Sequence, residues 1–134
     1  MADPAKMNTT ALAYLGDAIY EVFVRERVVR QGIGHADRLH REAVPYVCAE
    51  GQARAVRQIL PSLTQEEQDL VRRARNRRSA ARPRHADAVT YKWATAFEAL
   101  IGYLYLCGRT ERLNEVLERA ARVWEEPDSQ EKER

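Results

Sequence analysis

Apolar residues recur three and four positions apart along most of the chain, and no segment alternates apolar and polar residues over a convincing strand length. This spacing is typical of amphipathic α-helices, whereas half-buried strands alternate. The pattern therefore predicts an all-α fold in which about six helices form a single compact helical domain. The expected helices span residues 9–31, 36–42, 45–60, 64–73, 88–106 and 110–125.

Residues that cap helices support several of these boundaries. Asn8 or Thr9 can cap the first helix, and Thr64 with Glu67 has the spacing of a capping box. Pro45 lacks the backbone N–H that a helix interior needs, so we expect it in the first turn of the third helix. Local chemistry and periodicity thus indicate the same helical organisation.

The chain length favours one domain, because 134 residues is an ordinary domain size. We expect an N-terminal extension over residues 1–8, the domain over 9–126 with an arginine-rich loop at 75–87, and a disordered charged tail over 127–134. No stretch approaches the roughly 18 apolar residues of a membrane helix, and the first residues lack the order of a secretory signal. We therefore expect a cytoplasmic protein without membrane contact.

The formal net charge is only +2, but much of the basic charge is gathered in one segment. A guanidinium group can bind two phosphate oxygens at once, so such a cluster is a candidate phosphate-binding surface. A charge run is also often only a solvated face, and the charge alone leaves both interpretations open. The arginines that follow one another without an intervening acid are Arg72, Arg73, Arg75, Arg77, Arg78, Arg82 and Arg84.

Cysteines and histidines do not form the patterns of common metal sites. Cys48 and Cys107 lack the paired spacing of a zinc or redox site, and we expect reduced core thiols. His35, His40 and His85 match no metalloprotease pattern, so we expect surface or capping roles for them. A metal site in this chain would have to use carboxylates.

One such carboxylate lies in the segment LAYLGDAIYE of the first helix. Asp17 has apolar neighbours, and Gly16 interrupts a run of good helix formers. A glycine inside a helix costs about 1 kcal/mol relative to alanine, and a carboxylate facing a packed interior costs more unless it is paired or binds a metal. Some interaction must compensate for both choices.

The helix over residues 88–106 repeats this combination in FEALIGYLYL, where Gly102 follows Glu98 by one turn. Glycines allow helix backbones to approach closely, so we expect the two helices to cross near Gly16 and Gly102. Such a crossing would bring Asp17 and Glu98 to one point. Two carboxylates suit Mg²⁺, which keeps several waters and completes its shell with substrate phosphate.

Three neighbours lie on the same helix faces as these two acids. Glu21 follows Asp17 by one turn, whereas Thr95 and Tyr91 precede Glu98 by three and seven residues. We expect these residues to support the metal ligands, with Glu21 acting as a base or orienting a metal-bound water. The alternatives stay open, because a lone buried acid is usually paired with an arginine and tyrosines often serve the core.

Both acidic segments resemble motifs of a known family. LAYLGDAIYE looks like the signature helix of the ribonuclease III family, and TAFEALIGYLYL resembles its second acidic motif. LHREAVPYVCAEGQA and RRARN are similar to further family segments. The closer match is to Mini-ribonuclease III, the bacterial branch consisting of the catalytic domain alone. The resemblance covers essentially all of the expected domain.

The resemblance implies a helical homodimer that cuts double-stranded RNA, with one metal site per subunit. Asp17 and Glu98 match the family's metal-binding aspartate and glutamate, so both are expected to be catalytic ligands of Mg²⁺, with Mn²⁺ able to substitute. The resemblance also implies 5′-phosphate and 3′-hydroxyl product ends. The implied substrate is the double-stranded stem of precursor 23S ribosomal RNA.

The chain departs from full-length ribonuclease III at three positions. Thr10, Ala13 and Thr95 stand where larger relatives carry acids. These differences resemble the Mini branch and leave fewer protein ligands, so the number of metal ions stays open.

Basic residues of the domain itself are expected to contact RNA phosphates across an A-form helix. Arg75 and Asn76 match the family motif before the loop. The expected RNA-binding set is Arg72, Arg73, Arg75, Asn76, Arg77, Arg78 and Lys92.

Two other functions compete with a nuclease. A non-catalytic double-stranded RNA-binding module of the same fold would bind RNA without magnesium-dependent cutting. A helical adaptor whose arginines pair with an acidic protein would bind without preference for duplex RNA.

Overall fold

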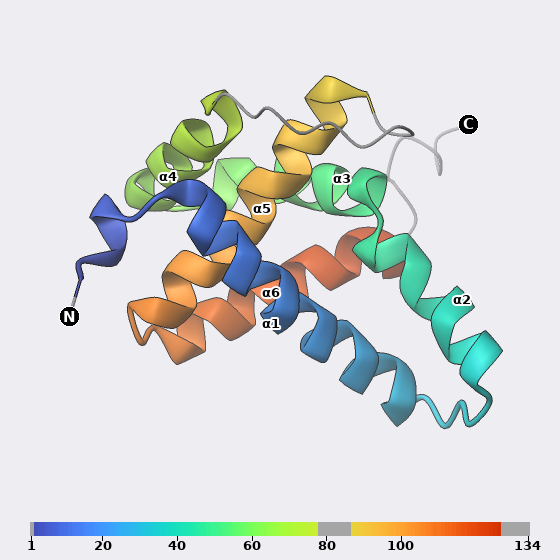
Figure 1. Cartoon of the computed structure of the whole chain (residues 1–134). Coiled ribbons are helices and arrows are strands. Elements are labelled where there is room, and N and C mark those ends of the chain that lie inside the picture. The colour runs from blue at the N-terminus through green and yellow to red at the C-terminus, as the bar shows by residue number, and fades with distance from the viewer. Residues whose placement is uncertain (1, 78–86, 127–134) are drawn as a thin grey trace.

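The computed structural model describes residues 2–77 and 87–126, and every regular element in these ranges is helical (Figure 1). The α-helices of the described ranges are α1 (Thr9–Arg30), α2 (Ala36–Val47), α3 (Ala49–Ile59), α4 (Gln65–Asn76), α5 (Ala88–Leu106) and α6 (Thr110–Glu125). Short 3₁₀ turns at Pro4–Lys6 and Leu60–Ser62 precede α1 and α4. The predicted all-α fold is confirmed.

Helix α5 is the centre of the core. Phe97, Leu100 and Ile101 in its middle turns are fully buried. Helices α1, α3, α4 and α6 all pack against it. Phe97 also meets the ring of Tyr20 from α1 edge to face, with 5.0 Å between the ring centroids. The positions of groups on α5 are therefore fixed from several sides.

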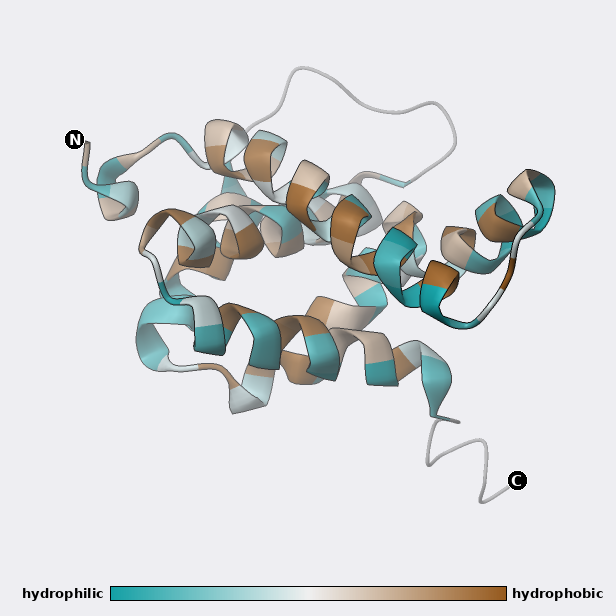
Figure 2. Cartoon of the chain, turned by 90° about the horizontal axis from the view of Figure 1, so that it is seen from below, coloured by the Kyte–Doolittle hydropathy of each residue, from teal (hydrophilic) through white to brown (hydrophobic). Residues whose placement is uncertain are grey.

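Helix α6 closes the core through an amphipathic face. Leu113, Val116 and Leu117 are buried, whereas Figure 2 shows hydrophilic residues along its outer side. No helix in the described part of the chain is long and apolar enough to cross a membrane.

The capping residues act largely as predicted. The Asn8 side chain accepts a hydrogen bond from the Thr10 backbone N–H at 2.7 Å, and it starts α1. Thr64 and Glu67 form the reciprocal bonds of a capping box at the start of α4. Asp87, for which no capping role was predicted, caps α5 by accepting from the Thr90 N–H at 2.8 Å. Side chains within one turn thus set these three boundaries.

The prediction for Pro45 is wrong. Pro45 lies inside the last turn of α2, and it does not open the next helix. Because proline cannot donate to the preceding turn, the helix ends shortly after it, at Val47. The half-buried thiol of Cys48 then accepts from the Gly51 N–H at 3.3 Å and caps α3, so Cys48 is a helix cap and not a core residue.

Helix α4 is longer than predicted, because it continues to Asn76. Arg75 and Asn76 are therefore helical, whereas the sequence placed them at the start of a loop. Helix-favouring residues and the strong start at Thr64 carry the helix one turn further. The remaining loop positions 78–86, with Arg78 among them, and the tail 127–134 lie outside the described residues.

A buried ion pair joins α4 to α6. Glu67 is 1% exposed and accepts two hydrogen bonds from the Arg112 guanidinium, at 2.7 and 2.8 Å. The bonds from Arg112 lower the pKa of the Glu67 carboxyl below its usual range despite its burial. Glu67 is therefore a buried acid of the usual kind, which is paired with an arginine.

Candidate active site

Helices α1 and α5 touch backbone to backbone where two glycines face each other. A Cβ on Gly16 would overlap the Glu98 carbonyl oxygen and lie 2.9 Å from the Gly102 backbone nitrogen. A Cβ on Gly102 would overlap the Leu12 carbonyl oxygen and lie 3.2 Å from the Gly16 nitrogen. Real side chains do not tolerate such contacts with backbone atoms, so the predicted crossing at these glycines is confirmed.

The crossing brings together the carboxyl groups of Asp17 and Glu98. Protonated Glu98 donates a hydrogen bond to Asp17. Burial, that hydrogen bond and the charge of Asp17 raise the pKa of Glu98 to about 9, so Glu98 retains its proton at neutral pH when no cation is bound. Asp17 itself is exposed, which corrects the expectation that it faces a packed interior.

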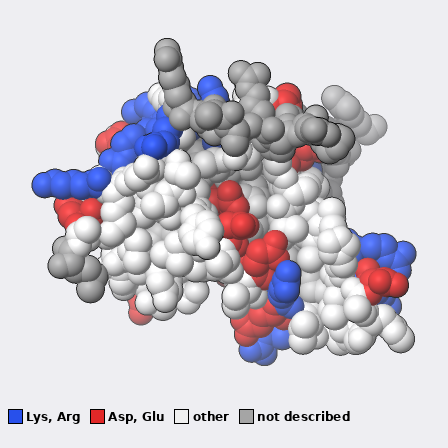
Figure 3. All heavy atoms as spheres, in the orientation of Figure 1, with Lys and Arg blue, Asp and Glu red and all other residues white. Residues whose placement is uncertain are grey.

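Glu21 adds a third carboxyl group to this region. It lies one turn after Asp17, is half-buried, and pairs with Arg25 at 3.2 Å. Its charge contributes to the raised pKa of Glu98. Figure 3 shows acidic side chains in a strip across the middle of this face, with basic side chains beside its lower part and largely uncharged surface to the left and right. The strip favours a cation.

Gln52 is a member of the site that the sequence reasoning missed. Its side chain is 4% exposed, and its Nε2 donates to the Val47 carbonyl oxygen at 2.9 Å. The Gln52 amide also lies near the Glu98 carboxyl, and it opposes the rise of the Glu98 pKa. The available signal was a polar residue on the apolar face of α3, in line with Val56 and Ile59.

The donor chemistry suits a hard divalent cation. Two carboxylates offer oxygen ligands of the kind that Mg²⁺ prefers, and a cation would replace the proton that Glu98 otherwise retains. Within the described ranges, no group of three or more His, Cys, Asp and Glu residues is placed to hold a metal ion. Asp17 and Glu98 would therefore act as a pair of ligands, and waters and substrate oxygens would complete the shell.

Thr95 and Tyr91 lie on the same side of α5 as Glu98, and both are half-buried. Their helical spacing from Glu98 matches the expectation, since residues three and seven apart share a helix face. Their role as supports of the ligands stays a prediction.

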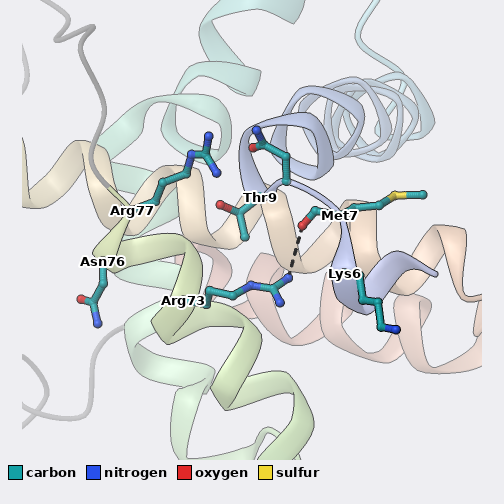
Figure 4. A pocket seen from close by; sticks show the side chains of 7 residues that line it. Lys6, Met7, Thr9, Arg73, Asn76 and Arg77 are labelled. Atoms are coloured by element: carbon teal, nitrogen blue, oxygen red, sulfur yellow. Dashed lines mark hydrogen bonds between the residues drawn. The ribbon is translucent and has the colours of Figure 1, made fainter. Parts of the chain in front are cut away.

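Basic side chains gather where the end of α4 meets the start of α1, and Figure 3 shows them at the edge of the same face. An open hollow of about 570 Å³ lies there (Figure 4). It is lined by Lys6, Met7, Asn8, Thr9, Arg73, Asn76 and Arg77. The hollow combines cationic side chains with the first turn of α1, whose positive dipole end also favours anions.

Arg73 has a structural task within this hollow. Its guanidinium donates to the backbone carbonyls of Ala5 at 2.6 Å and Met7 at 3.5 Å, and Figure 4 shows it turned toward the N-terminal segment. These bonds tie the segment before α1 to α4. Asn76 and Arg77 are exposed at the end of α4, on the other side of the hollow.

Other residues of the predicted RNA-binding set point in different directions. Arg75 is half-buried, and its guanidinium stacks on Trp93 of α5 with 4.8 Å to the ring centroid. Arg72 pairs with Asp69 at 3.4 Å on the surface of α4. Lys92 is exposed on α5. The set is therefore spread over several surfaces of α4 and α5.

Comparisons with known proteins identify relatives along most of the chain. Residues 10–109 match the family model described as Ribonuclease III domain. A Mini-ribonuclease 3 from Symbiobacterium thermophilum is 50% identical over 121 residues, covering 90% of this chain and 93% of that protein. One from Brevibacillus brevis is 42% identical over 123 residues, covering 92% of each. A crystal structure of a Fusobacterium nucleatum protein matches with a TM-score of 0.81 at 30% identity, covering 88% of this chain and 96% of that one.

The helix crossing predicts different costs for two glycine substitutions. Gly16→Ala should destabilise the protein by about 1–3 kcal/mol or more, because the new Cβ would push α1 from α5. Gly34→Ala is the matched control, since nothing lies within 4 Å of its Cβ position. Urea unfolding measures both. Equal stability of the two variants would contradict the backbone contact.

The raised pKa of Glu98 predicts a pH-dependent loss of stability without metal. Between about pH 4.3 and pH 9 the folded protein retains a proton that the unfolded chain releases, so the free energy of unfolding falls as pH rises. Glu98→Gln should remove this dependence. Its free energy of unfolding, compared with that of wild type, should therefore be about 1–3 kcal/mol more favourable at pH 8.5 than at pH 5. Urea unfolding in EDTA measures the gain, with the exposed Glu26→Gln as control. Parallel pH profiles of wild type and Glu98→Gln would refute it.

Proposed function

This chain belongs to the Mini-ribonuclease 3 branch of the ribonuclease III family, and we propose that Asp17 and Glu98 hold the divalent cation on which its activity depends. The protein is an endoribonuclease that hydrolyses double-stranded RNA. The observation that carries the metal proposal is the convergence of two carboxyl groups at the glycine crossing, where Glu98 cannot easily ionise without a cation.

Each carboxylate has a different part in this proposal. A bound Mg²⁺ would supply an acidified water and neutralise charge at the phosphate. Asp17 is exposed, so its carboxylate remains open to solvent and to RNA. Glu98 is held from the protein side, and it must lose its proton before it can act as a ligand. Cation affinity should therefore increase with pH until Glu98 is ionised.

The products and the physiological substrate are part of the same proposal. Attack by water gives 5′-phosphate and 3′-hydroxyl ends without a covalent enzyme intermediate. The substrate proposed from the family resemblance is the double-stranded stem of precursor 23S ribosomal RNA. We place the reaction in the cytoplasm, where that precursor is made.

Substitution of either ligand should separate cutting from binding. Asp17→Asn and Glu98→Gln keep the shape of each side chain but weaken the cation site, so we expect at least a hundredfold slower cutting of a labelled duplex in Mg²⁺, roughly 3 kcal/mol of lost stabilisation. Binding to the same duplex in Ca²⁺ should change little. Glu26→Gln on the exposed side of α1 serves as control. Cutting by Glu98→Gln at the wild-type rate would refute its role as a ligand.

We also propose that RNA phosphates bind the basic hollow at the end of α4. Arg77 and Lys6 line it, and Asn76 adds an amide. Arg73 donates to the backbone carbonyls of Ala5 and Met7, and these bonds hold the N-terminal segment that forms one wall of the hollow. Arg72, Arg75 and Lys92 stay candidates on the neighbouring surfaces of α4 and α5. The proposed recognition reads the backbone shape of a duplex more than its sequence.

Removal of one cation from the hollow should weaken binding of all duplexes about equally. For Arg77→Ala we expect the slope of log affinity against log salt to fall by about one, the value for one lost phosphate contact. Arg30→Ala is the control, because Arg30 lies at the opposite end of α1 and pairs with Glu26. A salt slope in Arg77→Ala equal to that of wild type would remove Arg77 from the interface.

A homodimer is proposed from an apolar stripe on α1 beside the carboxylate strip. Tyr14, Val22 and Val29 are 85%, 67% and 57% exposed, and their spacing places them along one side of the helix. Soluble monomers rarely expose such a patch without a partner. The second copy of the chain would cover it and bring two cation sites to one duplex.

A charge in the stripe should separate the subunits. Val22→Glu is expected to convert a dimer to a folded monomer in sedimentation experiments. Val89→Glu is the matched control, because Val89 is 62% exposed in the first turn of α5 and lies outside the stripe. A wild-type protein that sediments as a monomer at micromolar concentration would exclude this dimer.

A further inference from the structure

The side-chain amide of Gln52 is buried but is not fully hydrogen-bonded. Its Oε1 is buried and has no hydrogen-bond partner among the described residues. Most buried polar groups are paired, and an unpaired one costs stability. An apolar residue of similar size on this face of α3 would avoid that cost. Some other requirement therefore accounts for an amide at this position.

The orientation of the amide is fixed by its neighbour on α2. The Val47 carbonyl can only accept, so the group that faces it at 2.9 Å must be the NH₂ of Gln52. The same NH₂ group has a second hydrogen, and the Gln52 amide is close enough to the Glu98 carboxyl to oppose the rise of its pKa. The unpaired oxygen is thus the consequence of holding a donor between Val47 and Glu98.

We propose that Gln52 is a positioning residue that holds the Glu98 carboxylate in the orientation in which it binds the cation. The proposal rests on the proposed role of Glu98 as a metal ligand. Carboxylates that bind metals are usually themselves hydrogen-bonded, and loss of such a partner typically weakens metal binding or activity by 10–100-fold. Gln52 fits this task because it is fixed at the junction of α2 and α3, at Val47, independently of any cation.

The test compares two glutamines that differ in location. Gln52→Met keeps the length of the side chain and removes both the donor and the unpaired oxygen. Gln68→Met is the matched control, since Gln68 also donates to backbone carbonyls, those of Leu60 and Leu63 at 3.1 Å, but on α4. Binding of Mn²⁺ to the full chain without RNA is measured from the electron paramagnetic resonance signal of free Mn²⁺. Urea unfolding in EDTA measures stability.

We expect Gln52→Met to bind Mn²⁺ about tenfold more weakly than wild type, with a matching rise in the Mg²⁺ concentration needed for half-maximal cutting. Cutting at saturating Mg²⁺ should largely recover, which a misfolded protein would not do. Gln68→Met should lose stability but bind Mn²⁺ like wild type. Gln52→Leu provides a second variant if Gln52→Met fails to fold.

Two outcomes would overturn the proposal in distinguishable ways. If Asp17→Asn and Glu98→Gln weaken Mn²⁺ binding but the Gln52 variants bind like wild type, Gln52 has no positioning role and the metal site stands. If Asp17→Asn and Glu98→Gln leave Mn²⁺ binding unchanged, the metal site itself is wrong, and the role of Gln52 falls with it.

Discussion

The contact between the backbones of α1 and α5 is the constraint on which the site depends. Gly16 and Gly102 face each other with no room for a Cβ on either side. The distance between the helices is smaller than side chains at these positions would allow. Asp17 follows Gly16 directly and Glu98 lies one turn before Gly102, so the crossing brings their carboxyl groups within hydrogen-bonding reach. The energetic cost of two glycines inside helices is therefore the condition for assembling the carboxyl pair.

Two acids, the buried Glu67 and the half-buried Glu98, show how differently a carboxylate can be accommodated. Glu67 is paired with Arg112, and its pKa lies below the usual range. Glu98 meets Asp17 and the charge of Glu21, and its pKa lies far above that range. The first arrangement stabilises the fold at neutral pH and needs no ligand. The second keeps two carboxyl groups close together, and a cation at the proposed site would relieve this unfavourable interaction; such strongly shifted pKa values are typical of functional sites.

Local chemistry explains which parts of the fold could be predicted. The starts of α1, α4 and α5 depend on Asn8, Thr64 and Asp87, each acting within one turn. Helix α6 has no side-chain cap, and its bounds follow from the apolar periodicity alone. Pro45 was misplaced because proline favours the first turn of a helix, whereas here it lies in the last turn of α2 and lacks the N–H that would bond to the preceding turn. The close crossing was predictable because glycine inside a helix is costly and occurred twice beside an acid.

The site was predictable only in part, because its remaining features depend on tertiary contacts. Asp17 was expected to be buried since apolar residues surround it in sequence, but α1 also carries apolar residues such as Tyr14 and Val22 on its exposed side. When a helix is apolar on two sides, the sequence pattern does not indicate which side faces the core. Gln52 was missed because its importance depends on Glu98, which lies 46 positions away in sequence.

The most direct test of the carboxyl pair is diffraction from crystals of the full chain soaked in Mn²⁺, with data collected at the manganese absorption edge. The account predicts an anomalous peak bonded to oxygens of both Asp17 and Glu98, with waters in the remaining positions. Manganese bound only elsewhere, with the carboxyl groups of Glu98 and Asp17 still within hydrogen-bond distance of each other, would contradict it.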